Sequence, residues 1–402
     1  MSVAVASRSD LVQKARQAPV GRLTLFGAIA AILGGIVLVG GLISGHPERT
    51  WWAYHVNFMF WAGLAQGMVV FAAVLKLAKG HWGGVVIRFA EAATAFTTVT
   101  VLLFIGLVIG RDYIFTWIHE PRPDVGWWLT TKWFFLRNGL ILVALSWLSW
   151  RFVRHDTTPD ARELQSGEEV ERLTDSGVIS RDAAILVLAY AFGYSLLAFD
   201  LMMSLAQKWV SSLFGAFYFM GSFLAALMML AVLAITLRRA MGLGGIYTSR
   251  QQHDLGKLCF GFTVFWAYLM WSQFLVIWYG NLPEETYFIF YRLTGAWRPV
   301  GVAVFLMVFL IPFIGLLGVK PKTFSPTMVA FALVSLFGIW LERYLEVVPS
   351  INGGKGPAIG LTEAGVTLFF AGLFFLSWGW FARRYPIISP RLAADALQRE
   401  QH

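Results

Sequence analysis

Ten apolar segments, each long enough to cross a lipid bilayer, dominate this sequence of 402 residues. The hydrocarbon core of a bilayer takes roughly 20 helical residues to cross. An open sheet would leave backbone groups unpaired in lipid, so every span is expected to be a helix. The sequence therefore predicts an all-α polytopic membrane protein with ten transmembrane helices. We place the spans near residues 22–44, 51–76, 85–109, 130–152, 183–206, 211–237, 257–280, 298–318, 325–345 and 362–382.

The composition excludes several classes of soluble protein. Charged residues make up 14% of the chain and hydrophobic residues 57%, whereas charged residues are normally about a quarter of a sequence. In a membrane protein, the net charge of +9 indicates basic loops on one side rather than a nucleic-acid partner. A single cysteine, Cys259, excludes a disulfide framework and any Cys-ligated zinc or iron–sulfur site held by this chain alone.

The placement of basic residues predicts the orientation of the chain. Most of the 32 Lys and Arg residues fall in the two tails and in every second loop, which is typical of the cytoplasmic side. No small-residue cleavage pattern closely follows the first span, so we expect an uncleaved helix rather than a signal peptide. We expect a cytoplasmic tail at 1–21, a ten-helix domain at 22–382 with a cytoplasmic loop and short surface helix at 153–182, and a cytoplasmic tail at 383–402.

Ionisable side chains inside the spans are costly in lipid, so each one is a candidate site. Glu91 lies about 9 Å into the third span at 1.5 Å per residue. One interpretation is a proton-accepting carboxylate at the mouth of a half-channel, with Thr94, Thr97 and Thr98 continuing inward. The other is an Arg88–Glu91 surface pair at the membrane edge, because such (i, i+3) pairs are common.

A second group of candidates lies in the outer half of the membrane. Asp200, near the outer end of the fifth span, is either a proton relay or the partner of Lys208 or a neighbouring helix. Arg137 enters the fourth span from outside, deep enough to need a counter-charge. Asp200 and Glu342 come from the same outer half, which favours a structural ion pair with Arg137.

Two further polar groups lie near span ends. His253, Asp254 and Lys257 cluster at the cytoplasmic start of the seventh span. His253 beside Asp254 could gather protons near neutral pH, or Asp254 could cap the helix. Polar and charged residues also gather at the outer ends of the last helices, where a solvated rim is the default interpretation. They are Glu284, Glu285, Glu342, Arg343, Tyr344, Glu346 and Glu363. Only His55 lies inside a span, which excludes a bis-His haem site.

Several runs of sequence resemble one membrane-protein family. FDLMMSLAQKW at 199–209, HDLGK at 253–257 and IWYGNLPEE at 277–285 are together similar to the NrfD-like membrane subunits of bacterial alternative complex III, a quinol:electron-acceptor oxidoreductase. The resemblance covers all ten spans. The complex has two NrfD-like subunits of this kind, a C-type and an F-type. Four further runs resemble the F-type subunit: HVNFMF at 55–60, RFAEA at 88–92, KWFFLRN at 132–138 and RYLEVVPS at 343–350.

The resemblance implies an architecture and a set of partners. It implies two four-helix bundles plus two peripheral helices in the bacterial inner membrane. The partners would be a C-type NrfD-like subunit, an iron–sulfur protein, multihaem and monohaem cytochrome c subunits and a terminal oxidase. Haem c and iron–sulfur clusters would reside on these partners, with quinol as the substrate of the complex. This chain itself would hold no cofactor, metal or catalytic residue.

The role that the resemblance implies for this chain is accessory. It would contact membrane lipid, support assembly and carry a proton pathway coupled to quinol oxidation. The candidates for that pathway are Glu91, Asp200, His253, Asp254, Lys257 and Arg137.

Two alternatives to the accessory role are open. A C-type-like quinol-binding subunit would need a lateral pocket near the outer face with a side chain within hydrogen-bond reach of the quinol. His55 and Asp200 are the only plausible pair for that contact. A secondary transporter often shows inverted repeats with helices broken by Gly or Pro. We find no convincing inverted pair, and Gly in a membrane helix more often permits close packing.

Overall fold

The computed structural model of the chain is helical, and the residues that it describes contain no strand. Ten helices or helical pairs are long and apolar enough to span a membrane. The prediction of an all-α protein with ten candidate spans is therefore confirmed. The described residues are 11–12, 15, 20–45, 47–120, 123–166, 176–206, 208–353 and 355–400.

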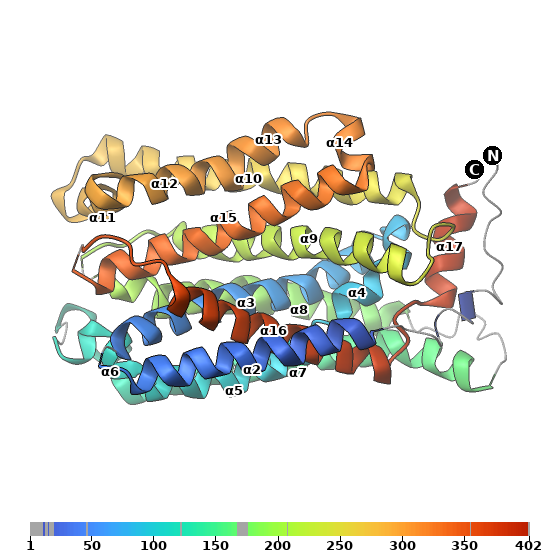
Figure 1. The fold of residues 1–402 in the computed structure, drawn as a ribbon, viewed down its shortest axis with the longest axis horizontal. Helices are drawn as coiled ribbons and strands as arrows, with labels where there is room; N and C mark the ends of the chain where they lie inside the picture. The colour runs from blue at the N-terminus through green and yellow to red at the C-terminus, as the bar shows by residue number, and fades with distance from the viewer. Residues whose placement is uncertain are drawn as a thin grey trace.

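The first five spans run back and forth between the two ends of the molecule (Figure 1). The third span is divided, because a short break between α4 and α5 interrupts the helix at its start. These spans are α2 (Gly21–Ile43), α3 (Pro47–Leu77), α4 with α5 (Ile87–Glu91 and Thr94–Ile109), α7 (Thr131–Ser166) and α8 (Ser176–Leu201).

The last five spans continue the same alternation. The eighth span is again divided, this time by a π-helical stretch, η6 (Phe305–Leu310), between two α-helical pieces. The other spans and pieces are α9 (Phe214–Ala240), α10 (Ser249–Gly280), α12 with α13 (Arg298–Val304 and Ile311–Gly315), α15 (Ser325–Ile351) and α16 (Leu361–Arg384).

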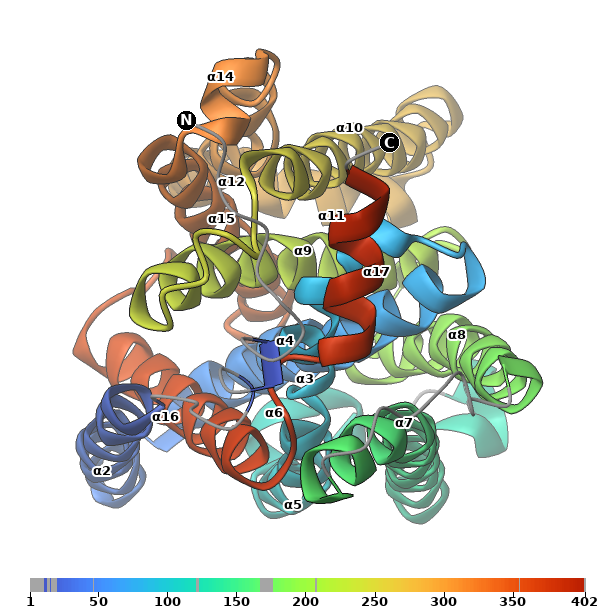
Figure 2. The same ribbon diagram turned by 90° about the vertical axis from the view of Figure 1, so that its right-hand side faces the viewer.

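The helices form two groups of four around the buried helices α3 and α9, which pack against each other (Figure 2). In the first group α3 contacts α5 and α8, and α7 contacts both α5 and α8. In the second, α9 contacts α10 and α15, and α15 contacts α12 and η6. The remaining two spans, α2 and α16, pack mainly on each other and reach the first group through α16.

Small residues hold α2 against α16. A Cβ atom added to Gly34 would lie 2.2 Å from the backbone nitrogen of Phe369, and one added to Gly372 would lie 2.2 Å from that of Ala31. Glycine lets membrane helices approach this closely. The outward face of α2 carries exposed apolar side chains, so this helix is the most peripheral span.

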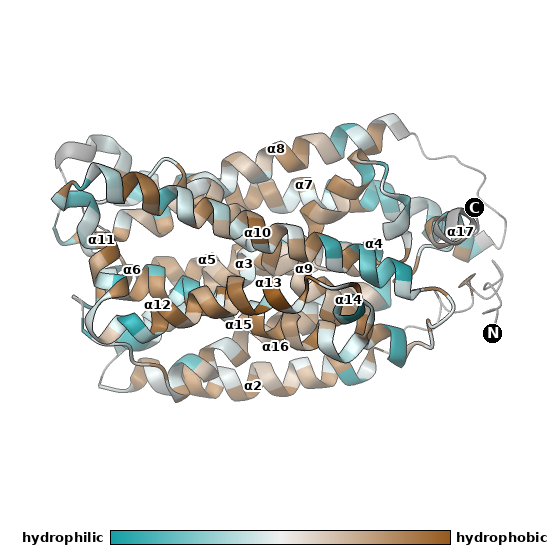
Figure 3. Ribbon diagram, turned by 90° about the horizontal axis from the view of Figure 1, so that it is seen from above, coloured by the Kyte–Doolittle hydropathy of each residue, from teal (hydrophilic) through white to brown (hydrophobic). Residues whose placement is uncertain are grey.

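The two ends of the bundle differ in their capping elements. Helix α17 (Pro390–Glu400) crosses one end and packs on η1 (His81–Val85), whereas α11 (Pro283–Leu293) lies at the other (Figure 1). Helix α2 begins and α16 ends at the α17 end. Hydrophilic residues gather toward both ends and apolar residues fill the length between them (Figure 3). We refer below to the α17 end and the α11 end.

Two predicted boundaries do not match the helix ends. The segment predicted as a loop at 153–182 is largely helical, because α7 continues to Ser166 and α8 begins at Ser176. Helix α10 begins at Ser249 rather than near residue 257, and the hydroxyl of Thr248 accepts a hydrogen bond from the backbone of Gln251 (3.3 Å) at its start. Thr248 caps this helix, so the suggestion that Asp254 caps it is wrong. Both helices extend beyond the apolar stretch that hydropathy detects.

Candidate functional site: three buried ionic clusters

The largest buried ionic cluster lies near the α17 end and is centred on Arg88. Helix α4, which follows η1 directly, brings Arg88 and Glu91 between α3, α7 and α9. The cluster combines side chains from α3, α4, α7 and α17. These six residues, called the Arg88 cluster below, are Lys76, Arg88, Glu91, Asp156, Asp160 and Arg391.

The guanidinium of Arg88 contacts three carboxylates and a backbone carbonyl. Its Nη1 donates to Asp156 Oδ2 (2.9 Å) and to Glu91. Its Nε donates to Asp160 Oδ2 (3.2 Å), and its Nη2 donates to the Asp156 carbonyl (2.7 Å). All four side chains are fully buried. The Arg88–Glu91 pair predicted for the membrane edge does form, but it is not at the surface.

Two more cations balance the remaining negative charge. Lys76 Nζ lies 2.8 Å from Asp156 Oδ1, and Arg391 on α17 lies 3.7 Å from a carboxylate oxygen of both Asp156 and Asp160. Three basic groups thus face three acidic groups. Burial of charge is tolerated only when the charges are paired and hydrogen-bonded. The equal number of positive and negative side chains therefore stabilises this cluster.

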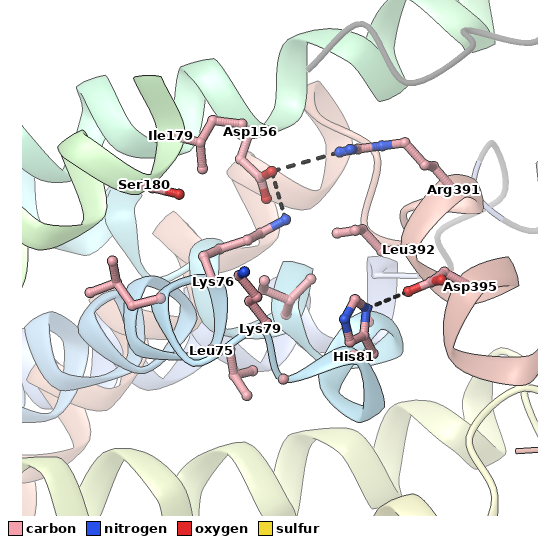
Figure 4. A pocket seen from close by; sticks show the side chains of 14 residues that line it. Leu75, Lys76, Lys79, His81, Asp156, Ile179, Ser180, Arg391, Leu392 and Asp395 are labelled. Carbon is pink, nitrogen blue, oxygen red and sulfur yellow. Dashed lines mark hydrogen bonds and ion pairs between the residues drawn. The ribbon is translucent and has the colours of Figure 1, made fainter. Parts of the chain in front are cut away.

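A cavity of about 600 Å³ opens beside the Arg88 cluster (Figure 4). Lys76 reaches Asp156 from below in this view and Arg391 reaches it from the right, and His81 Nδ1 lies 2.6 Å from Asp395 Oδ2. Asp156 lines this cavity, whereas Glu91 lies behind it. The Asp156 side chain is itself fully buried, and the partly exposed side chains of Lys76 and Arg391 connect it to the cavity.

Hydroxyl and amide side chains continue from the Arg88 cluster toward the middle of the bundle. The Thr94 hydroxyl is buried without a hydrogen-bond partner. Deeper in, Thr97 Oγ1 lies 3.1 Å from Ser146 Oγ, and Gln66 donates to Ser149 Oγ (2.9 Å). These polar side chains belong to α3, α5 and α7 and lie inward of Glu91.

Tyrosines at the contact between the two helix groups do not continue this series of polar side chains. Tyr194 and Tyr218 stack with their ring centroids 5.9 Å apart. Their hydroxyls donate to backbone carbonyls, that of Tyr194 to Ala62 (2.7 Å) and that of Tyr218 to Met59 (2.9 Å). Because each hydroxyl proton is already engaged, a proton could pass here only after a rearrangement.

The second cluster surrounds Asp200 near the α11 end. Arg137 Nε donates to Asp200 Oδ2 (2.8 Å), and Arg137 Nη2 lies 2.6 Å from the same oxygen. Asn138 donates to Oδ2 (2.9 Å) and the Trp128 indole to Oδ1 (3.0 Å). The ion pair that the sequence favoured is therefore present. Asp200 pairs with Arg137 rather than with Lys208, and Asp200 rather than Glu342 is the counter-charge of Arg137.

Replacing Asp200 by asparagine is expected to lower the free energy of unfolding by about 3–5 kcal/mol, because Arg137 would stay buried without its counter-charge. The measurement is the thermal unfolding midpoint of the purified chain in detergent. Asp112→Asn is the matched control, since the Arg111–Asp112 pair is exposed and such pairs contribute little. Equal midpoints for the two variants would show that the Asp200 pair is not structural.

His55 does not form an open site with Asp200. The imidazole is fully buried, its ring centroid lies 5.7 Å from that of Phe115, and neither ring nitrogen has a hydrogen-bond partner. Asp200 is itself buried and engaged by Arg137. Neither side chain lines the cavity between α9, α10, α11, α12 and α15, and the quinone contact suggested for this pair stays a prediction.

His253, Asp254 and Lys257 lie on the side of α10, apart from the Arg88 cluster. Lys257 Nζ lies 2.6 Å from Asp254 Oδ1, and the lysine side chain is 58% exposed. His253 is only partly buried. This is a solvated (i, i+3) pair of the kind common on helix surfaces, and it shares no ion pair with Arg88.

The third cluster contradicts the prediction of a solvated rim at Glu342, Arg343 and Glu346, whereas Glu284 of the same prediction is exposed. Arg343 Nη1 lies 3.0 Å from Glu346 Oε2, and its guanidinium carbon lies 4.4 Å from the centre of the Tyr218 ring. The Trp266 indole donates to Glu342 Oε1 (3.1 Å). Glu342, Arg343 and Glu346 are all buried. They lie on the face of α15 that packs against α9, where Trp266 of α10 reaches Glu342.

No protein-family model matches this chain, and no curated protein matches it. Function must therefore be inferred from the residues and their geometry. Within the described residues, no group of three or more His, Cys, Asp or Glu side chains is placed to hold a metal ion. The side chains of the Arg88 cluster are carboxylates, guanidiniums and one lysine ammonium, which are groups for acid–base and electrostatic interactions.

Sequence reasoning missed Asp156, Asp160 and Arg391 as members of a site. The two aspartates were assigned to a loop, although their four-residue spacing places them on one face of a helix. Arg391 lies in the predicted C-terminal tail, and nothing in the local sequence indicates that α17 folds back over the bundle. The spacing of Asp156 and Asp160 was the one available signal.

Proposed function

We propose that this chain is an accessory membrane subunit of a respiratory quinol oxidoreductase of the alternative complex III type. In this proposal it supports assembly and carries a proton pathway coupled to quinol oxidation, while partner subunits hold haem c and iron–sulfur clusters. The observation that carries the proposal is the charge-balanced Arg88 cluster, which is fully buried at its centre yet open to a cavity at the α17 end.

The geometry of this cluster suits proton uptake. A proton arriving through the cavity first meets Asp156, which lies beside Lys76 and Arg88. Glu91 contacts the same guanidinium and stands at the start of the polar side chains that lead toward Gln66. Intramembrane carboxylates paired in this way are typical of proton relays.

The orientation in the proposal follows from the basic residues. Lys320 and Lys322 in α14 (Val319–Thr323), together with Arg383 and Arg384 at the end of α16, lie at the α17 end. An excess of Lys and Arg is typical of the cytoplasmic side. We therefore assign the α17 end and both termini to the cytoplasm of a bacterial inner membrane, so that the cavity would admit cytoplasmic protons.

The resemblance of seven runs of sequence to the NrfD-like subunits supports the assignment to this kind of complex. The run at 199–209 supplies Asp200, and the run at 343–350 supplies Arg343 and Glu346. All three side chains are buried in ion pairs. These runs therefore include residues that the fold depends on, as expected of a shared architecture.

Subunit composition tests the proposal. We expect an affinity-tagged copy, expressed from its own locus and extracted in mild detergent, to bring down partners with the absorption spectrum of haem c and the iron content of iron–sulfur clusters. Extraction of an untagged strain is the matched control for proteins that bind the resin. Recovery of the chain alone or as a homo-oligomer that transports a solute would contradict the proposal and favour a secondary transporter.

A further inference from the structure

Three candidate membrane spans begin or end at the cavity beside the Arg88 cluster. Helix α3 ends at Leu77, the third span begins at Ile87 and the fifth span begins at Gly177. Leu77 and Ile87 line this cavity, and so does Ile179 from the first turns of α8. Because the apolar length of a span matches the hydrocarbon core, the cavity lies at the depth where that core gives way to the lipid head groups.

The lining of this cavity carries more basic than acidic side chains. Three basic groups and two carboxylates line it, which are Lys76, Lys79, Arg391, Asp156 and Asp395. Both carboxylates already have a partner in the lining. Lys76 lies 2.8 Å from Asp156, and His81 lies 2.6 Å from Asp395. With His81 counted as neutral, the lining therefore has an excess of one positive charge.

Lys79 supplies this excess charge at the mouth of the cavity. Its side chain is exposed, and within the part of the chain that the structure describes it makes no hydrogen bond or ion pair. In Figure 4 the ammonium groups of Lys76 and Lys79 both point up, toward the side on which Asp156 and Ser180 lie. An ammonium group has three donors, so both lysines can donate to a further acceptor.

The backbone of Lys79 lies in a conformation that lysine rarely adopts. Its φ is 51°, in the left-handed region that costs a residue with a Cβ atom about 1–2 kcal/mol. It follows the last residue of α3 by two positions, where glycine is the usual residue. Strain of this kind gathers at ligand sites. A lysine at this position therefore indicates a role for its ammonium group.

The apolar part of the lining identifies the kind of anion that fits. Leu77 and Ile179 offer a surface that a free phosphate ion would not use, whereas the glycerol and first methylene groups of a lipid would be buried against it. Basic pockets between membrane helices bind phospholipid head groups. One excess positive charge matches one phosphodiester, and the cavity volume of about 600 Å³ is within the range of ligand sites.

We propose that this cavity binds the head group of a singly charged anionic phospholipid, of the phosphatidylglycerol type. Lys76, Lys79 and the hydroxyl of Ser180 donate hydrogen bonds to its phosphate oxygens. The acyl chains leave past Leu77, which is 39% exposed. The proposal concerns lipid binding alone. It does not depend on the proton pathway or on the partners of the proposed complex.

Titration of the purified full-length chain with phosphatidylglycerol or phosphatidylcholine, followed by native mass spectrometry, tests the proposal. Lys79→Gln is expected to weaken phosphatidylglycerol binding roughly fivefold, the effect of one lysine near a membrane surface, and to leave phosphatidylcholine binding unchanged. Lys320→Gln is the matched control. It removes an exposed lysine from the same end of the molecule but outside the cavity, and should bind both lipids like the parent chain.

A glycine variant separates lipid binding from folding. Glycine adopts a positive φ without a steric penalty, so Lys79→Gly should have a thermal unfolding midpoint in detergent at least as high as that of the parent chain. We expect it to lose phosphatidylglycerol affinity as Lys79→Gln does. A purely structural role for this lysine would instead lower the midpoint and leave the affinity of the folded chain unchanged.

Glycerophosphoglycerol, which is the head group without its chains, distinguishes a lipid from a soluble phosphate ester. We expect it to compete roughly tenfold less well than the lipid, because about two methylene groups buried in the cavity account for that factor.

Three results would overturn the proposal. They are equal phosphatidylglycerol affinity in Lys79→Gln and Lys320→Gln, equal affinity of the parent chain for the two lipids, and equal competition by glycerophosphoglycerol. Each can occur while haem-containing partners still co-purify, so failure here is distinguishable from failure of the proposed function.

Discussion

Replacing Arg88 by methionine is expected to prevent the chain from accumulating as a folded protein. The substitution leaves three carboxylates facing two cations in a site whose central side chains are fully buried. Removing one partner from a buried ionic group costs about 3–5 kcal/mol, a large fraction of the stability of a typical protein. Fluorescence-detected gel filtration of detergent extracts measures the folded, monodisperse fraction.

A second substitution tests whether charge balance is the cause. Arg88→Met combined with Asp160→Asn leaves two carboxylates and two cations, and we expect it to recover part of the folded fraction. Arg111→Met, at an exposed pair, is the matched control and should behave like the parent chain. If Arg88→Met alone folds as well as this control, the cluster does not hold α4, α7 and α17 together.

Replacing Glu91 by glutamine is expected to reduce proton uptake per electron from the α17 side to near zero in the assembled complex, because the pathway loses a group that can accept and release a proton. The amide keeps the shape of the side chain but cannot take up and release a proton. Proton uptake per electron, measured with a pH-sensitive dye in reconstituted vesicles, is the decisive quantity.

Asp254→Asn provides the comparison for that measurement. It removes a carboxylate from the same end of the molecule, but from a solvated pair with Lys257, and its proton uptake should match that of the parent complex. An unchanged proton yield per electron in Glu91→Gln would remove this residue from the mechanism. A reduced yield in both variants would indicate a general surface effect.

The depth of a residue along its span was the useful predictor of ionic partners. Arg137 and Asp200 were both predicted near the outer ends of neighbouring spans, and they form the expected pair at the α11 end. Depth follows directly from sequence position, because each helical residue advances the chain by 1.5 Å. When two opposite charges lie at the same depth on adjacent helices, pairing is a reasonable prediction.

Rotation about the helix axis limited the prediction of the other sites. Glu342 and Glu346 lie nine and five residues before the end of α15, which suggests a solvated rim, but they lie on the face that packs against α9. The moderate apolar character all around such a helix hides which face is inward. Asp156 was missed for a related reason. The apolar stretch ends where polar residues begin, but helix α7 continues through these polar residues to Ser166.

Hydropathy and charge placement alone determined that this chain is a ten-span helical membrane protein, because the thickness of the hydrocarbon core sets the length of an apolar helix and unpaired backbone groups exclude other structures there. Only the tertiary structure decided which charged side chains meet, that α17 folds over the Arg88 cluster, and that a cavity opens beside this cluster. These contacts join residues far apart in the sequence, and they depend on how each helix is rotated and which helices it packs against.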